Sequence, residues 1–319
     1  MFSLKHLFNN KRYHTFNFHL KKTFGLKVYK VAVDAGFTCP NRDGTKGKSG
    51  CIYCNEKGSG AEYIKNGLPL EEQIVHGINL IKRRYKAKKF IIYFQPFSNT
   101  YASLSYLRKI YDVALSFDDV LGISIGTRPD CLNEDVIDII EEYSKRTYLW
   151  LEIGLQSIHN KTLKLIRRGH TYQDFLKAYY RVKKRNIRTC FHVIIGLPGE
   201  SKEEILQTAK EVARLEPEGI KIHSLYIEKG TVLEKMFKKN PFKVFDMEEY
   251  IRILVDFLEL LPYKVIIQRV IGESNKNKLV APDWILKKQE VMKKIDQEFL
   301  LRGSWQGKKY NSAENKKPF

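Results

Sequence analysis

Apolar runs alternate regularly with amphipathic stretches over the first 260 residues or so of the chain. Six short runs rich in β-branched and aromatic residues predict strands, at 27–35, 89–95, 120–126, 147–154, 188–196 and 219–227. The clearest helical patterns between them cover 69–85, 133–145 and 201–215. Pro69, Asn133 and Ser201 stand where helices begin. This alternation predicts a parallel sheet with helical crossovers, and the nearly continuous apolar strands predict that both of its faces are covered.

Polar and glycine residues follow several of these strands directly. They occur at 94–96, 126–128, 154–156 and 196–199. A partial barrel and a doubly wound sheet both fit the pattern. In either fold, ligands bind at the carboxyl ends of the strands, so the candidate site lies there.

The alternation stops after Pro262. One more strand-like run, 263–272, precedes a loop and a helical pattern at 283–303. The predicted organisation is therefore a basic N-terminal arm (1–26), a core (27–261), a small C-terminal α/β extension (262–307) and a polar, disordered tail (308–319).

The net charge of the chain predicts a polyanionic partner, which the strand and helix pattern alone does not. Its 319 residues include 56 Lys and Arg against 36 Asp and Glu, a net charge of +20. Basic residues are interleaved with aromatics at 11–22, 81–89, 179–188, 235–243 and in the last helix and tail. Exposed rings beside cations suit RNA, whose unstacked bases stack on aromatics. Each run taken singly is more typical of a solvated helix face, and only the runs together favour RNA.

The chain also shows no signal for export or a membrane. No apolar run approaches the roughly 18 to 20 residues that cross a bilayer, and the first residues lack the apolar region of a secretory signal. The odd number of cysteines, five, is a poor disulfide framework. A cytoplasmic location is predicted, with the thiols serving metal or redox chemistry.

Three of the cysteines, Cys39, Cys51 and Cys54, lie in one glycine-rich loop after the first predicted strand. Thiolates at this density bind zinc or an iron–sulfur cluster. A structural zinc site closes with four ligands, and no second C-x₂-C pair is present, whereas three ligands on a cubane cluster leave one iron open. Cys131 and Cys190 stand alone and are predicted to be buried free thiols.

The loop ending Cys51-Ile52-Tyr53-Cys54 resembles the radical S-adenosylmethionine (SAM) superfamily, although the gap after Cys39 is wider than its usual C-x₃-C-x₂-C. The strings "GFTCPNRDGTKGKSGCIYCNEKGSG", "YFQPFSNTY", "GTRPDCL", "GLQS", "RRGH", "GLPGE" and "LVAPDW" closely resemble the YhcC/YtqA-type family, related to the Elongator catalytic subunit branch. The match runs from about Tyr13 to Gly307. It implies a partial (β/α)6 TIM-type barrel of the radical SAM type.

The resemblance also implies a set of site residues. Cys39, Cys51 and Cys54 would ligate a [4Fe–4S] cluster whose fourth iron binds SAM. The positions that it places near SAM are Tyr53, Gln95, Ser98, Asn99, Thr127, Arg128, Glu152, Gln156 and Arg168. The segment with Gln95, Ser98 and Asn99 lacks the glycines that other members have there.

Several of these positions have a second, structural interpretation. Tyr53 also fits a loop anchor, and Arg128 a capped turn. Arg168 and His170 fit either the SAM carboxylate or a helix end. Glu152 in an apolar strand is costly unless paired, which favours a role in the site. Glu152, His192 and His223 are the catalytic candidates. The two histidines also fit core positions in which their ring nitrogens are hydrogen-bonded.

The implied chemistry is reductive cleavage of SAM to a 5′-deoxyadenosyl radical, with a flavodoxin or ferredoxin as reductant. The related branch points to tRNA and to the carbon-5 side chain of the wobble uridine. The predicted reaction converts the carboxymethylaminomethyl group to aminomethyl. The alternatives are radical SAM chemistry on a small anionic metabolite and a zinc-stabilised RNA-binding module without catalysis.

Overall fold

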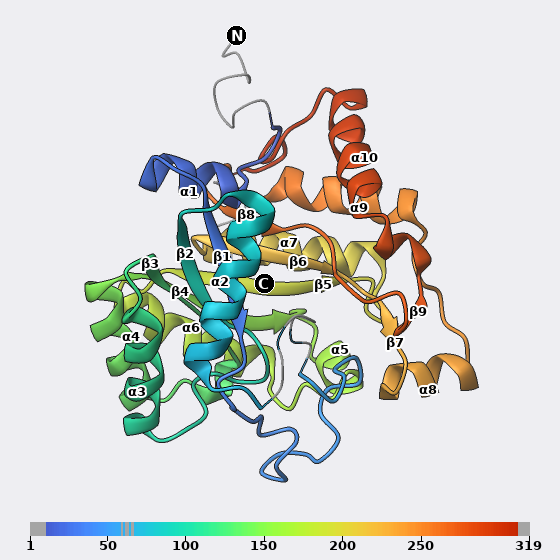
Figure 1. The fold of residues 1–319 in the computed structure, drawn as a ribbon. Coiled ribbons are helices and arrows are strands. Elements are labelled where there is room, and N and C mark those ends of the chain that lie inside the picture. Colours follow the sequence, from blue (N-terminus) through green and yellow to red (C-terminus); the bar gives the residue numbers. More distant parts are fainter. Residues whose placement is uncertain (1–10, 59, 61–63, 65–66, 312–319) are drawn as a thin grey trace. The chain divides into compact units, whose positions relative to one another are not determined.

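The computed structural model describes residues 11–58, 60, 64 and 67–311 (Figure 1). The chain divides into two compact units. The thiol-loop unit comprises Leu20–Leu155 and Arg167–Cys190, and the C-terminal unit comprises the described parts of Met1–His19, Gln156–Ile166 and Phe191–Phe319. The first ten residues of the predicted N-terminal arm and residues 312–319 of the predicted tail lie outside the described residues.

Within the described residues, seven strands form one sheet in the order β1-β2-β3-β4-β5-β6-β8. Their bounds are β1 Val28–Val33, β2 Lys89–Phe94, β3 Val120–Thr127, β4 Tyr148–Gln156, β5 Thr189–Ile195, β6 Gly219–Ser224 and β8 Ile266–Arg269. The pairs β1–β2, β2–β3, β3–β4 and β6–β8 are parallel. All six predicted strands are present. The strand-like run after Pro262 supplies the seventh, whose place in the same sheet was not predicted.

The described helices of the thiol-loop unit are α2 (Leu70–Tyr85), α3 (Leu104–Leu115), the short η2 (Pro129–Cys131), α4 (Glu134–Arg146) and α6 (Tyr172–Lys184). Three of them, α3, α4 and α6, begin where a side chain accepts from a backbone N–H group of the first turn. The Ser103 and Asn133 side chains accept from the backbone of α3 and α4, and Thr171 forms a capping box with Asp174. The helix α1 (Phe16–Phe24) precedes β1.

The two faces of β1–β4 differ in chemistry. Paired positions of parallel strands share a face, and one face carries apolar residues that pack on the helices. The Tyr29 and Tyr85 rings of β1 and α2 stack with centroids 5.0 Å apart, and the Phe94 and Tyr111 rings of β2 and α3 are 5.4 Å apart. The opposite face, here the polar face, carries Lys30, Ala32, Tyr93, Ser124 and Glu152. The charged side chains of these strands therefore lie on the face opposite the helices.

The C-terminal unit packs helices against β5, β6 and β8. These helices are α5 (Asn160–Leu165), α7 (Lys202–Leu215), α8 (Val232–Lys239), α9 (Met247–Leu260), η3 (Asp283–Leu286) and α10 (Lys288–Leu301). A capping box of Ser201 and Glu204 starts α7, as the sequence predicted. The strands β7 (Ile227–Glu228) and β9 (Leu279–Ala281) form a separate antiparallel pair. None of the helices in the described part of the chain has the length and hydropathy to cross a membrane.

Candidate active site

The three-cysteine loop lies over the carboxyl ends of β1 and β2, where the Ser98 amide donates to the Thr38 carbonyl at 3.2 Å. Cys39 and Cys51 are buried and Cys54 is half-buried, and none of the three forms a disulfide in the described structure. The Cys54 amide donates to the Cys51 carbonyl at 3.0 Å, which closes a tight turn between this pair. The loop is therefore ordered around its thiols in the described structure.

The Arg42 side chain holds the second half of this loop. Its guanidinium donates to the carbonyls of Cys54 and Asn55 at 3.2 and 2.5 Å. Gly50 has φ of +72°, and a Cβ there would lie 3.0 Å from the Arg42 Nε atom. A glycine is thus needed at position 50, both for its backbone conformation and for this close approach.

Cys51 accepts hydrogen bonds from two side chains. The Asn41 Nδ2 atom lies 3.5 Å from the sulfur and the Arg168 Nη1 atom 3.6 Å from it. Burial raises the pKa of the Cys51 thiol, but the charges of Arg168 and Arg128 and the two hydrogen bonds outweigh it, so the pKa lies below its usual value. Arg168 also donates to the Gly154 carbonyl at the end of β4, at 3.1 Å. The environment favours a thiolate at Cys51.

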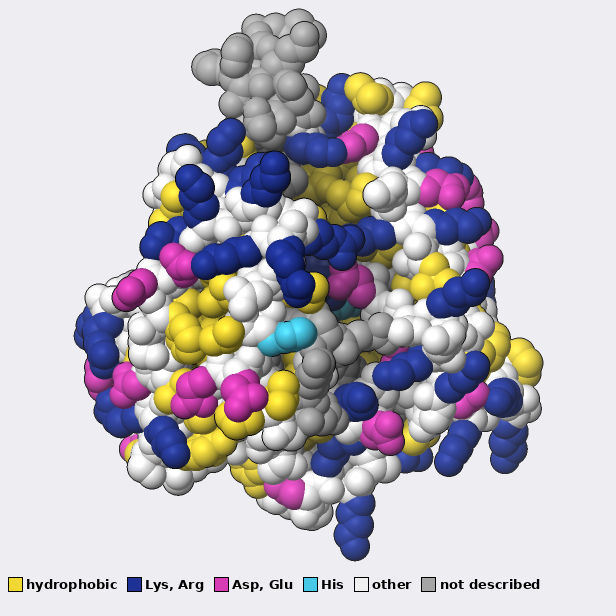
Figure 2. All heavy atoms as spheres, viewed as in Figure 1, with side chains coloured by type: hydrophobic (Ala, Val, Ile, Leu, Met, Phe, Trp, Pro, Cys, Tyr) yellow, Lys and Arg dark blue, Asp and Glu magenta, His cyan; other side chains and the backbone are white. Residues whose placement is uncertain are grey.

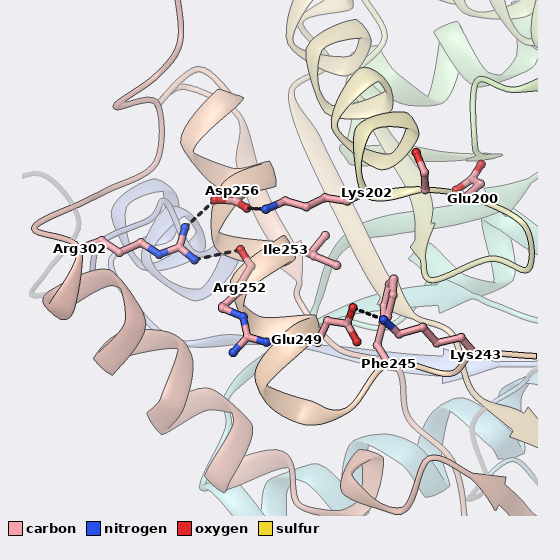
Figure 3. A pocket seen from close by; sticks show the side chains of 10 residues that line it. Glu200, Lys202, Lys243, Phe245, Glu249, Arg252, Ile253, Asp256 and Arg302 are labelled. Atoms are coloured by element: carbon pink, nitrogen blue, oxygen red, sulfur yellow. Dashed lines mark hydrogen bonds and ion pairs between the residues drawn. The ribbon is translucent and has the colours of Figure 1, made fainter.

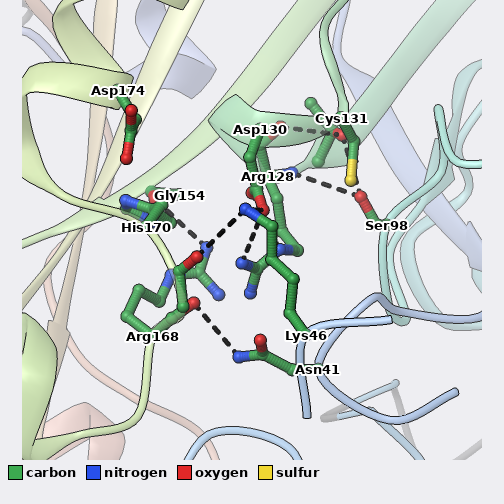
Figure 4. Close-up of polar contacts among 12 residues, drawn as sticks. Asn41, Lys46, Ser98, Arg128, Asp130, Cys131, Gly154, Arg168, His170 and Asp174 are labelled. Carbon is green, nitrogen blue, oxygen red and sulfur yellow. Dashed lines mark hydrogen bonds and ion pairs between the residues drawn. The ribbon is translucent and has the colours of Figure 1, made fainter. Parts of the chain in front are cut away.

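The end of β3 adds a second buried guanidinium. Arg128 makes a two-pronged pair with Asp130, both distances 2.9 Å, and the Lys46 ammonium lies 2.7 Å from the same carboxylate (Figure 4). Burial raises the pKa of Asp130, but the Arg128 charge and the hydrogen bonds of Arg128 and Lys46 overcome it and lower the pKa to about 2. Pro129 begins the turn η2, which has no side-chain cap, so the turn and the buried arginine are both present but the predicted cap is not.

Glycine at position 169 lets these groups meet. Gly169 has φ of +72°, and a Cβ there would lie 2.4 Å from the Asn41 Oδ1 atom and 3.3 Å from the Arg128 Nη2 atom. The Lys46 ammonium donates to the Gly169 carbonyl at 3.1 Å. The segment with Arg168 and His170 is therefore locked onto the thiol loop.

Ser98, Asn99 and Thr127 are fully or almost fully buried. The Asn99 amide donates to the carbonyls of Phe94, Pro96 and Gly126 at 2.8–3.0 Å. The hydroxyl of Thr127 lies within hydrogen-bond distance of those of Ser98 and Thr100. In the described structure these side chains fix the loop after β2, and their contact with SAM stays a prediction. Thr100, which accompanies them, was not predicted.

Among the buried polar atoms of this site that have no hydrogen-bond partner in the described structure are Arg128 Nη1, Arg168 Nε and His170 Nε2. The Nδ1 atom of His170 lies 3.1 Å from the Thr171 carbonyl, which assigns the proton to Nδ1 and leaves Nε2 as an acceptor. Burial and the charges of Arg168 and Arg128 lower the pKa of His170 to about 3. Buried unsatisfied donors are costly. These atoms therefore mark a place for a ligand.

Tyr53 lies half-buried between Cys51 and Cys54. Burial and the nearby Cys51 and Cys54 sulfurs raise its pKa well above the usual value, so the hydroxyl keeps its proton. Cys131 and Cys190 are buried free thiols, as predicted. Burial raises the pKa of Cys131 to about 11, which keeps it an inert thiol.

Glu152, a predicted site residue, has a partner that the sequence did not reveal. The Lys30 ammonium of β1 lies 2.5 Å from its carboxylate, and the Ser124 hydroxyl of β3 donates to the same oxygen. Lys30 also lies 3.1 Å from the Ser124 hydroxyl and over the Tyr93 ring. The carboxylate is thus paired on the polar face.

The C-terminal unit carries the remaining predicted residues. Gln156 ends β4 with φ of +72°, a strained value for glutamine. The rings of His192 and His223 have centroids 5.4 Å apart, so the structure brings these two together. Gln95 lies in the thiol-loop unit, where its backbone amide donates to the Val33 carbonyl at 3.4 Å, and its contact with SAM stays a prediction.

A pocket of about 580 Å³ also lies in this unit, between the start of α7 and α9 (Figure 3). Its charges are largely paired: Lys202 and Arg302 each lie 2.6 Å from Asp256, and Lys243 lies 2.6 Å from Glu249. This pairing leaves little charge for a ligand, and the pocket contains none of the predicted site residues.

No group of three or more His, Cys, Asp or Glu side chains in the described residues is arranged to hold a single metal ion. A four-iron cluster has a different requirement, because each thiolate binds a different iron. The three sulfurs therefore need not converge on one point.

Comparison with known proteins decides the family. The model described as "Radical SAM superfamily" matches residues 39–212, beginning at Cys39, and the "Radical_SAM C-terminal domain" matches residues 217–300. The chain belongs to the radical SAM superfamily. YtqA of Bacillus subtilis is 42% identical over 305 residues, 95% of this chain and 94% of that protein. The YhcC/YtqA-type assignment is thereby confirmed.

Two further similarities concern parts of the chain or the fold. A tRNA uridine(34) acetyltransferase of Methanocaldococcus infernus is 30% identical over 154 residues, 47% of this chain and 28% of that protein. An N-terminally truncated Elp3 structure from the same organism has a TM-score of 0.61 at 19% identity, covering 88% of this chain and 64% of that one. This likeness shows the fold, and the predicted partial barrel of the radical SAM type is confirmed.

Membership implies a [4Fe–4S] cluster and SAM as cofactors. The residues present fit both. Three thiols with one depressed pKa provide the soft donors that iron–sulfur clusters take. The unsatisfied donors of Arg128 and Arg168 suit an anionic group such as the SAM carboxylate.

Proposed function

We propose that this radical SAM enzyme modifies tRNA at the wobble uridine, converting the carboxymethylaminomethyl group on carbon 5 to aminomethyl. The observation that carries the tRNA part is a surface of exposed, unpaired cations on the same unit that holds the thiol loop. The partial similarity to a tRNA uridine(34) acetyltransferase supports the same substrate.

In this proposal Cys39, Cys51 and Cys54 would hold the cluster, and the cluster with SAM would supply a 5′-deoxyadenosyl radical. Arg168, fixed between Cys51 and Gly154, binds the SAM carboxylate with Arg128. His170 Nε2, an acceptor, suits a hydroxyl or ammonium donor of SAM. The burial of all three side chains excludes water from the reaction. Tyr53, Gln95, Ser98, Asn99, Thr127 and Gln156 remain proposed SAM contacts.

The reaction balances as a two-electron oxidation followed by hydrolysis. The methylene between the nitrogen and the carboxylate of the substrate loses a hydrogen atom, then an electron and a proton, which leaves an imine. Water releases the aminomethyl group and glyoxylate. SAM is the oxidant overall and leaves as methionine and 5′-deoxyadenosine, with one proton. A flavodoxin or ferredoxin supplies the priming electron.

The cation surface lies at the amino ends of β1 and β2, and we call it the basic edge: Lys27, Arg83, Arg84, Lys86 and Lys88. Val28 pairs with Lys89, which sets Lys27 beside Lys88, and the stacked Tyr29 and Tyr85 bring the end of α2 to the start of β1. All five cations are exposed. Figure 2 shows lysine and arginine side chains gathered over α1 and the C-terminal end of α2.

Carboxylates are scarce at the basic edge. Asp119 pairs with Lys82 and Lys89, at 2.6 and 3.7 Å, and neither of these belongs to the five. The five cations have no carboxylate partner among the described residues. Unpaired cations release counterions from a phosphate backbone, so this edge suits RNA. Tyr85, 46% exposed, adds a ring for stacking.

The basic run 179–188, a second predicted RNA contact, has a different environment. Arg185 lies within 3.2 Å of carboxylate oxygens of Glu134, Asp138 and Glu141, and Arg181 lies 3.6 Å from Glu134. Arg188 stacks over the Tyr148 and Trp150 rings. The carboxylates of α4 therefore neutralise much of this run.

Nucleoside mass spectrometry of tRNA from a strain lacking the protein tests the proposed reaction. We expect the carboxymethylaminomethyl form to accumulate and the aminomethyl form, with any product made from it, to disappear. Purified enzyme should release one 5′-deoxyadenosine for each aminomethyl group formed. An unchanged wobble-uridine profile would reject the tRNA assignment.

A further inference from the structure

The polar face of the thiol-loop unit carries a charged cluster that the SAM site does not need. It consists of Lys30 on β1, Ser124 on β3 and Glu152 on β4, with Tyr93 of β2 beneath the lysine. These residues come from four adjacent strands and are up to 122 positions apart in the chain. The fold, rather than any local motif, brings them together.

The cluster is asymmetric in its exposure. The Glu152 side chain is 0% exposed and that of Lys30 is 16% exposed. Ser124 is fully buried and its hydroxyl donates to the carboxylate that Lys30 also binds. The carboxylate therefore lies behind the ammonium and fixes its position, while the ammonium is the charged group that a ligand on this face reaches.

A buried ion pair is a poor source of stability, because removing both charges from water costs as much as their attraction returns. Apolar residues can fill positions in these strands, since the helix-facing side of the same strands carries valine, isoleucine and phenylalanine. The polar face instead carries this ion pair, and the Lys30 side chain is partly exposed there.

The cluster also has a defined place relative to the SAM site. Glu152 and Gly154 lie on the same face of β4, two residues apart, or about 7 Å along the strand. The Gly154 carbonyl is the acceptor of Arg168, which contacts Cys51. The Lys30 ammonium contacts Glu152, so it lies farther from the carboxyl end of β4 than Gly154, which Arg168 contacts.

We propose that Lys30, positioned by Glu152 and Ser124, binds the carboxylate of the substrate side chain and so sets the methylene next to it in reach of the SAM site. The inference rests on the proposed function. It changes the role of Glu152 from a contact of SAM to a positioning residue for Lys30. An ammonium on a fixed carboxylate gives a charge-assisted hydrogen bond to the acid and none to the amine product.

The test uses RNA anticodon stem-loops that carry either the carboxymethylaminomethyl or the aminomethyl group at the wobble uridine. We expect the wild-type holoenzyme to bind the acid form roughly 10- to 100-fold more tightly, the range for a charge-assisted hydrogen bond. Lys30→Met leaves Glu152 buried without its cation and is prone to misfold. The double variant Lys30→Met/Glu152→Gln removes both charges, and Lys109→Met, an exposed lysine of α3, is the matched control.

The double variant should lose the preference for the acid form while it keeps wild-type iron content, SAM affinity and affinity for the amine form. Lys109→Met should behave as wild type. A preference that persists in the double variant overturns the inference alone, and so does a fall in SAM affinity, which would assign Lys30 to the cofactor. A wild-type enzyme that neither discriminates the two stem-loops nor converts the acid form rejects the proposed function, and the inference with it.

Discussion

The two ends of strands β1–β4 are both rich in cations, but they hold them in opposite ways. At the carboxyl end, Arg128 and Arg168 are buried and fixed by Asp130, Gly154 and Cys51. At the amino end, the basic edge is exposed and has no carboxylate partners among the described residues. Buried, oriented cations recognise one small anion, whereas exposed and unpaired cations attract a polyanion.

In the proposed function, the +20 charge of the chain has at least two separate uses. We assign one set of cations to a cofactor and the other to an RNA partner. The neutralised run 179–188 shows that a basic stretch of sequence is not by itself a binding surface. Variants at either end should therefore affect one function and spare the other.

The largest effect is expected at the carboxyl end. Arg168→Gln removes the charge that we assign to the SAM carboxylate and should lower SAM affinity about 100-fold. RNA affinity should stay unchanged. Isothermal titration with SAM, on enzyme with its cluster loaded, measures the first effect. The control is Arg167→Gln, the exposed neighbour, which should bind SAM as wild type does; equal losses in both variants would remove the assignment of Arg168.

The next effect is expected at the amino end. The triple variant Arg83→Gln/Arg84→Gln/Lys88→Gln should lower RNA affinity roughly 10- to 100-fold and reduce the slope of log affinity against log salt by about 2, since each contact on single strands contributes about 0.7. SAM cleavage without RNA should not change. Filter binding of tRNA across a salt series gives both numbers.

The matched control for that triple variant is Arg181→Gln/Lys183→Gln/Arg185→Gln, which removes the same charge from α6 and its end. Because the α4 carboxylates already neutralise much of this run, RNA affinity and the salt slope should stay close to wild type. Equal losses in the two triple variants would mean that total charge, rather than the basic edge, governs RNA binding.

The smallest effect concerns pH and the carboxyl end. His170 has a pKa of about 3 in the folded protein, against its usual 6.5. As the pH falls, the unfolded chain therefore takes up a proton at His170 before the folded protein does. Its contribution to stability is full above pH 6.5 and is lost as the pH falls from 6.5 toward 3. Between pH 7.5 and 5, His170→Gln should lose about 2 kcal/mol less unfolding free energy than wild type. Urea titrations of both proteins at the two pH values measure this difference, and parallel losses would contradict it.

The sequence predicted the elements of the fold well because the strands and helices have strong, different periodicities. It also predicted which edge carries the site, since polar residues follow β3 and β4 directly. The place of β8 in the sheet was not predictable, because strand order depends on contacts between distant segments rather than on local pattern.

Partners far apart in the chain were missed for the same reason. Glu152 was a predicted site residue, but nothing local to it points to Lys30. The local sequence of 179–188 likewise does not indicate that carboxylates of α4 pair with it. The three thiols were found through residue type, because thiolates at this density bind zinc or an iron–sulfur cluster. Arg128 and Arg168 were found through the resemblance to the family.

The most direct test of the account is iron and sulfide analysis of protein purified without oxygen. The account predicts a coloured protein with about four irons and four sulfides per chain, as in a cubane cluster. Alanine at Cys39, Cys51 or Cys54 should abolish both, whereas Cys190→Ala should retain them. A colourless wild-type protein, or unchanged iron in all three loop variants, would contradict the central claim that this loop holds a catalytic cluster.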